Sequence, residues 1–162
     1  MNRLLTFPNP VNEVSARLVA AGVVILGVAT IATDARWLFV LLGYGFVARV
    51  LTGPTLSPLG QLVTRVVVPR LSVPPKYVPG PPKRFAQGIG ATFSVAALVA
   101  RTGFDARLAA DVLVGFVVVA ATLESVFAYC LGCKIFGLLM RAGVVPERVC
   151  AECADIWARR PA

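Results

Sequence analysis

Histidine is missing from this chain of 162 residues. Its absence excludes hydrolases of the usual kind, in which a histidine activates a serine or cysteine nucleophile. It also excludes haem held by histidine and zinc sites that contain histidine. Any chemistry of this chain must come from other side chains.

Charge is the second scarce property. Only 15% of the residues are charged, 57% are hydrophobic, and the mean hydropathy is +0.79. A soluble domain usually has about 25% charged residues, because its surface faces water. The composition therefore predicts a protein that lies in a membrane.

The apolar residues fall in four blocks, and each is predicted to be a transmembrane helix of about 20 residues. The blocks cover residues 10–33, 35–51, 85–100 and 107–129. The short turns "TDAR" and "RTGFDAR" join them in pairs, which indicates an all-α, up-down four-helix bundle. We expect Pro10 in the first helical turn, after an Asn9 cap. Because the apolar cores are short, we expect Arg17 and Arg49 to extend to the aqueous boundary.

The segment 52–83 differs, since it holds eight of the twelve prolines. It is predicted to be a stiff, extended loop after Pro69, with a short amphipathic segment before that residue. The sequence thus divides into a transmembrane domain, 1–129, and a cysteine-rich tail, 130–162.

The positions of the basic residues predict the orientation. Four crossings would place thirteen of the sixteen Lys and Arg residues on the side of the termini and of the loop 52–83, and three on the opposite side. By the positive-inside rule, both termini of a multi-pass protein of the cytoplasmic membrane would then be cytoplasmic. Attraction to the lipid bilayer explains this basicity without a nucleic-acid partner. No cleavable signal peptide is predicted, because the first apolar run begins well inside the chain.

All four cysteines lie in two CxxC pairs, Cys130/Cys133 and Cys150/Cys153, with sixteen residues between the pairs. The predicted topology places them on the cytoplasmic side, where thiols are kept reduced, so permanent disulfides are not expected. Two interpretations remain.

The first interpretation is a zinc site. Two CxxC pairs at this spacing match structural sites in which four thiolates hold one Zn²⁺. The protein would then be a non-enzymatic membrane scaffold or accessory subunit, whose tail is clamped by Cys130, Cys133, Cys150 and Cys153.

The second interpretation is thiol chemistry. Each pair precedes a predicted short helix, whose N-terminus stabilises a thiolate, and Lys134 would do the same for the first pair. Cys130 or Cys150 would receive electrons or sulfur, and Cys133 and Cys153 would resolve the mixed disulfides.

Glu124 is an acidic residue inside the last apolar block. A carboxylate there is costly unless it is neutral, paired or near water. It is a candidate for proton transfer to or from the thiols, and pairing with an arginine of the loop is the structural alternative. A small transporter built around Glu124 is a third, less supported interpretation.

Three segments, "KRFAQGIGATFSVAAL", "CLGCKIFGLL" and "GVVPERVCAEC", resemble an uncharacterised family of small bacterial multi-pass membrane proteins with paired CxxC motifs, known as a domain of unknown function. The resemblance implies a protein of the inner membrane. It also suggests a soluble thioredoxin-like or rhodanese-like partner, or a larger membrane complex. It implies no established activity.

Overall fold

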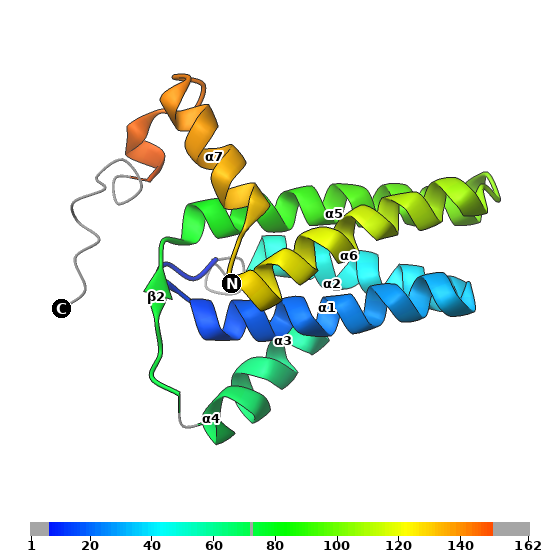
Figure 1. The fold of residues 1–162 in the computed structure, drawn as a ribbon, viewed down its shortest axis with the longest axis horizontal. Helices are drawn as coiled ribbons and strands as arrows, with labels where there is room; N and C mark the ends of the chain where they lie inside the picture. Colours follow the sequence, from blue (N-terminus) through cyan, green and yellow to red (C-terminus); the bar gives the residue numbers. More distant parts are fainter. Residues whose placement is uncertain (1–6, 72, 151–162) are drawn as a thin grey trace.

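Four long helices lie side by side and run alternately up and down in the computed structural model, which describes residues 7–71 and 73–150 (Figure 1). They are α1 (Glu13–Thr33), α2 (Arg36–Thr52), α5 (Gly80–Gly103) and α6 (Arg107–Phe127). The all-helical bundle is thus confirmed, apart from a pairing of two short strands.

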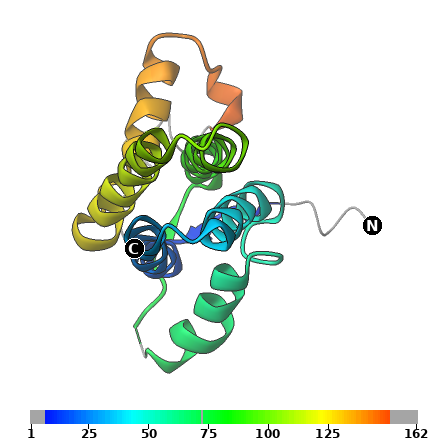
Figure 2. The same ribbon diagram turned by 90° about the vertical axis from the view of Figure 1, so that its right-hand side faces the viewer.

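The core lies between these four helices. Helix α1 packs mainly on α6 and α2 mainly on α5, while α5 and α6 also pack on each other. Phe39 and Leu42 of α2 meet Ala97 of α5 and Val114 of α6 there, and all four are at most 2% exposed. Shorter segments flank the bundle on opposite sides, with α7 (Leu131–Arg141) on one and α3 (Pro58–Leu62) and α4 (Val68–Arg70) on the other (Figure 2).

Two of the described helices, α1 and α6, are long and apolar enough to cross a membrane. Only 28% of the apolar stretch of α1 and 22% of that of α6 is buried inside the protein. Helix α2 is shorter, at 17 residues, and α5 has Lys83 and Arg84 in its first two turns. The length and composition of the helices therefore support two of the four predicted crossings.

The N-terminal boundary of the first helix was predicted wrongly. Helix α1 begins at Glu13, not Pro10, and Asn12 caps it by accepting a hydrogen bond from the Val14 N–H at 3.0 Å. The preceding strand β1 (Val11–Asn12) pairs antiparallel with β2 (Tyr77–Val78). This pairing joins segments far apart in the sequence and holds residues 11 and 12 extended.

The segment 52–83 is helical over Pro58–Arg70, where a short amphipathic segment was predicted. Helix α3, a π-helical stretch (Val63–Val67) and α4 follow one another without a break. Two prolines that were assigned to the extended part, Pro81 and Pro82, lie instead in the first turn of α5, where the missing N–H groups need no partner within the helix. The helix therefore starts at Gly80, three residues before the predicted end of the loop.

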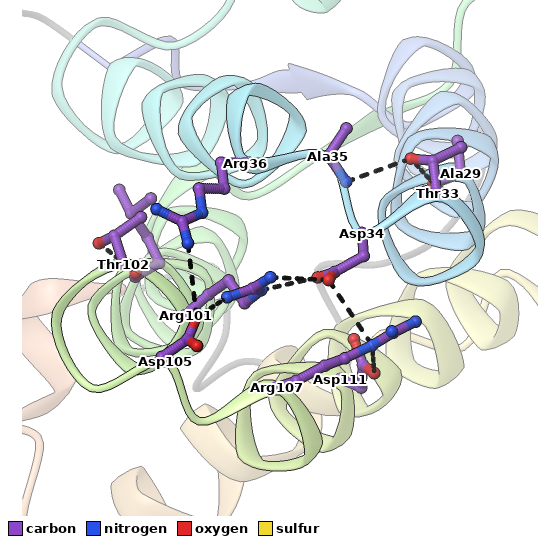
Figure 3. A network of polar contacts seen from close by, with 11 residues as sticks. Ala29, Thr33, Asp34, Ala35, Arg36, Arg101, Thr102, Asp105, Arg107 and Asp111 are labelled. Carbon is purple, nitrogen blue, oxygen red and sulfur yellow. Dashed lines mark hydrogen bonds and ion pairs between the residues drawn. The ribbon is translucent and has the colours of Figure 1, made fainter.

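Charged side chains join the two tight turns at the far end of the bundle (Figure 3). Arg101 of α5 donates to Asp34 through Nε and Nη2, both at 2.7 Å. Asp34 ends α1 in the left-handed region, with φ 51°. Arg101 also pairs with Asp105 of the second turn, and Arg107 Nε lies 3.7 Å from Asp34 Oδ2. These ion pairs fix one helical hairpin against the other.

The network predicts a pH-dependent contribution of Asp34 to stability. The hydrogen bonds from Arg101, helped by the charges of Arg101, Arg107 and Arg36 and opposed by burial, hold the pKa of Asp34 below its ordinary value. A lowered pKa contributes stability above the unfolded-state pKa of about 3.9, and that stability is lost as the pH falls through the folded-state pKa. Asp34→Asn should lower the thermal midpoint in detergent at pH 7, and the difference from wild type should shrink toward pH 3.

Asp105→Asn is the matched control, because the side chain of Asp105 is 76% exposed. It should lower the midpoint less than Asp34→Asn. An equal loss in the two variants, or a loss for Asp34→Asn that does not change with pH, would contradict this account.

Candidate functional site

The first CxxC pair lies where the chain leaves the bundle. Ala128 ends α6 in the left-handed region, with φ 54°, and the chain then turns into α7. Cys130 is the N-cap of α7, and its Sγ accepts a hydrogen bond from the Cys133 backbone N–H at 3.4 Å. The pair thus occupies a helix N-terminus, where the positive end of the helix dipole favours a thiolate.

Helix α7 approaches α5 closely at Gly132, between the two cysteines. A Cβ on Gly132 would lie 2.5 Å from both Cα and Cβ of Ala86. One turn further, the rings of Phe136 and Phe85 pack with centroids 5.6 Å apart. The glycine in "CLGC" therefore brings the thiols against the first turns of α5.

An ion pair lies beside the thiols. Lys83 of α5 donates to Oε1 of Glu124 of α6 at 2.5 Å, and the two side chains are only 10% and 15% exposed. Both the ammonium and the carboxylate act electrostatically on the two thiols. Removing one partner of a partly buried charge pair destabilises the protein, because the other charge is left uncompensated.

The groups around the two thiols shift their pKa values in opposite directions. The hydrogen bond from Cys133 lowers the pKa of Cys130, and Lys83 and the Cys133 N–H act in the same direction, against burial and Glu124. The same thiol–thiol hydrogen bond raises the pKa of Cys133, together with burial and the nearby negative charge. Cys130 is therefore the more acidic thiol of the pair and Cys133 the less acidic one.

Two arginines that were expected at the aqueous boundary both donate hydrogen bonds to other helices. Arg17 of α1 donates to the carbonyls of Ser125 and Val126, where α6 ends, at 3.0–3.2 Å. Arg49 of α2 is 5% exposed and donates to Gln87 of α5 at 3.0 Å. The prediction for Arg49 was wrong because Gln87, on another helix, supplies a partner inside the bundle.

The structure brings three of the predicted site residues together, namely Cys130, Cys133 and Glu124. The Lys134 Nζ lies 5.5 Å from the centre of the Tyr129 ring. Cys150 is 5% exposed and disulfide-bonded at the end of the described chain, so the expectation that no disulfide forms was wrong for this cysteine, and Cys153 lies outside the described residues. The role predicted for Lys134 stays a prediction, while Lys83 is the cation found to act on both thiols.

Lys83 and Arg49 were not among the predicted site residues. A signal was present, since both lie in or beside apolar blocks at the end of the bundle that carries Glu124 and the cysteines. An up-down bundle brings those ends together. The pairing itself depends on how α2, α5 and α6 rotate about their axes, which composition does not specify.

Of the four cysteines in the zinc interpretation, three lie in the part of the chain that the structure describes, and Cys153 lies outside it. Within residues 7–71 and 73–150, no group of three or more His, Cys, Asp or Glu is arranged to hold a metal ion. A four-thiolate site would also need Cys153, so it stays a prediction.

Comparison with known families gives one match. The model of a family described as "Domain of unknown function (DUF4395)" matches residues 11–141. This chain belongs to that family. No curated protein and no solved structure matches it. In this DUF4395 chain, the matched region covers the four long helices, α7, Cys130 and Cys133, and ends before Cys150.

The ion pair of this DUF4395 protein predicts opposite effects of two substitutions on the reactivity of Cys130. Lys83→Gln should raise the pKa of Cys130, because it removes a cation and leaves the Glu124 carboxylate. Glu124→Gln should lower that pKa, because it removes an anion. The measurement is the alkylation rate of Cys130 as a function of pH, followed by mass spectrometry of the peptide that carries it.

Lys134→Gln serves as the control, because the Lys134 ammonium lies against the Tyr129 ring. It should move the Cys130 profile less than Lys83→Gln. Shifts of the same sign for Lys83→Gln and Glu124→Gln would show that the pair does not act through charge.

Proposed function

We propose that this protein spans the cytoplasmic membrane and exchanges electrons with a soluble partner through the Cys130/Cys133 dithiol. The observation that carries the proposal is the pair of unequal thiols at the N-terminus of α7, beside the Lys83–Glu124 ion pair. A dithiol with one more acidic and one less acidic sulfur can form a mixed disulfide and then release it.

The surface of the bundle supports the membrane location. Large apolar side chains are exposed on α1, α2 and α6, among them Ile25 (72%), Trp37 (65%) and Phe116 (60%). Apolar surface of this extent is unfavourable in water and favourable in lipid. We infer four crossings, with α2 and α5 completing the bundle that α1 and α6 begin, and both termini in the cytoplasm.

The exchange proceeds in two steps. In the first, the Cys130 thiolate attacks a disulfide of a thioredoxin-like partner, and an S–S bond to Cys130 forms as the partner's S–S bond breaks. In the second, the Cys133 sulfur gives up its proton and attacks Cys130, which forms the Cys130–Cys133 disulfide and releases the second partner thiol. The partner gains two electrons and two protons, one from Cys133 and one from water because Cys130 reacts as the thiolate, and the reverse sequence oxidises the partner.

Glu124 is proposed as the group that receives the proton of Cys133. It lies beside both thiols and pairs with Lys83. The Cys133 thiol must lose its proton before it can attack, so a nearby acceptor accelerates the second step.

The second candidate is a membrane scaffold with a structural zinc. The spacing of the two CxxC pairs favours it, because that spacing is typical of four-thiolate sites. In that case the thiols would hold a metal and would not exchange with a partner.

Metal content and thiol titration separate the two candidates. Protein purified in detergent without a chelator should contain no zinc and should show a reversible dithiol/disulfide couple. The couple should persist when Cys150 and Cys153 are both replaced by Ser, and it should vanish in Cys130→Ser. About one zinc per chain, with thiols that react only after denaturation, would instead establish the clamp.

The orientation is tested with single cysteines in a background where the four native cysteines are replaced by Ser. Thr102→Cys lies at the far turn, and Tyr77→Cys lies at the end that carries the thiols, where Tyr77 is 62% exposed. A membrane-impermeant maleimide should label Thr102→Cys in intact cells and Tyr77→Cys only after permeabilisation. The opposite pattern would invert the orientation, and labelling of both positions in intact cells would refute the membrane location.

A further inference from the structure

A cavity of about 220 Å³ lies between the helices directly inside the candidate site. Its walls come from α1, α2, α5, α6 and the start of α7, and most of the lining is apolar, including Phe46, Phe93 and Val117. Phe116 also lines it and is 60% exposed, so the cavity reaches the outer surface of the bundle.

The polar side chains that line the cavity come from the end of the bundle that carries the thiols. Cys130 and Glu124 line it, together with Arg49 and Gln87. Arg49 donates a hydrogen bond from Nε to Gln87 Oε1 at 3.0 Å, and its Nη1 lies 3.5 Å from Oγ of the buried Ser57. An arginine has five N–H donors, so donors of Arg49 and the amide of Gln87 remain for a ligand oxygen.

We propose that this cavity binds the head group of a lipid-soluble quinone, which takes the electrons of the Cys130/Cys133 dithiol. The inference rests on the proposed thiol chemistry and names its electron acceptor. The volume is below the roughly 300–1,000 Å³ of sites that enclose a whole drug-sized ligand, so it suits a ring whose tail stays outside. The side open at Phe116 would leave that tail in the lipid.

The combination of groups selects a quinone over an acyl chain. A flat ring fits among aromatic walls, and its carbonyl oxygens accept hydrogen bonds from the arginine and the amide. An acyl chain offers no acceptor to the free donors of Arg49 and Gln87, so it would gain no hydrogen bond there. The thiol that lines the cavity is Cys130, the more acidic of the pair.

The reaction balances in electrons and protons. The Cys130 thiolate adds to the quinone ring and forms a C–S bond, so the ring gains an electron pair. Cys133 then loses its proton and attacks the Cys130 sulfur, which forms the S–S bond and breaks the C–S bond. One ring oxygen takes the proton of Cys133 and the other takes a proton from water, because Cys130 reacts as the thiolate, and the products are one disulfide and one quinol.

The test uses the full chain in detergent and a benzoquinone with a decyl tail. Wild-type protein should bind this quinone saturably, and each reduced chain should convert one quinone to quinol as two thiols disappear. Cys130→Ser should still bind the quinone and should form no quinol.

A matched pair of variants locates the binding. Ala120 lines the cavity, whereas its neighbour Val119 is 58% exposed. Ala120→Phe should fill the cavity and weaken binding by about tenfold or more, while Val119→Phe should leave binding unchanged. Equal effects of the two variants would overturn the proposal, as would binding to wild type that never saturates.

The result also separates this inference from the proposed function. A reversible thiol couple in a wild-type protein that binds no quinone, or that binds it without forming quinol, overturns the quinone site alone. Loss of the thiol couple itself overturns the proposed function, and the acceptor with it.

Discussion

The ion pair between Lys83 and Glu124 joins α5 to α6 at the point where the chain turns into α7. Neither charge would be stable alone in such a setting, because removal from water is costly for a lone ammonium or carboxylate. Each therefore requires the other, and the requirement sets how the two helices rotate toward each other. The arrangement of the thiols follows from it, since α7 starts against the same turns of α5.

The two ends of the bundle use charge differently. At the far end, Arg101 links the two turns through Asp34, whose side chain is 18% exposed, and Asp105, whose side chain is 76% exposed. At the thiol end, Lys83, Glu124 and Arg49 are largely buried, and they lie among groups with reactive or polar character. The Arg101 network aligns the two helical hairpins, which is a structural role. The network at the thiol end places opposite charges beside a pair of thiols, which is the reason we assign function to that end.

Hydropathy alone predicted the four long helices and their alternating direction, because long apolar runs and tight turns are local properties of the sequence. The start of α1 was not predictable in this way, since Val11 and Asn12 are held extended by a strand more than sixty residues later. The first turn of α5 was misassigned because its prolines are as compatible with a helix start as with an extended loop. Cys130, Cys133 and Glu124 were named from the sequence, whereas the pairing of Lys83 and Arg49 was not specified by it. Their partners Glu124 and Gln87 lie on other helices, and only the packed bundle brings them together.

The inequality of the two sulfurs has a consequence for any partner that meets this end of the protein. With Cys130 ionised, the thiolate, the Lys83 ammonium and the Glu124 carboxylate sum to one negative charge. Joining the two sulfurs removes the thiolate and leaves a neutral set. The oxidised and reduced proteins would thus differ by one charge at a partly buried site, where a charge is weakly screened. A docking surface that carries a positive charge would bind the reduced form more tightly and release the oxidised one, so the redox state would itself set how long a partner stays.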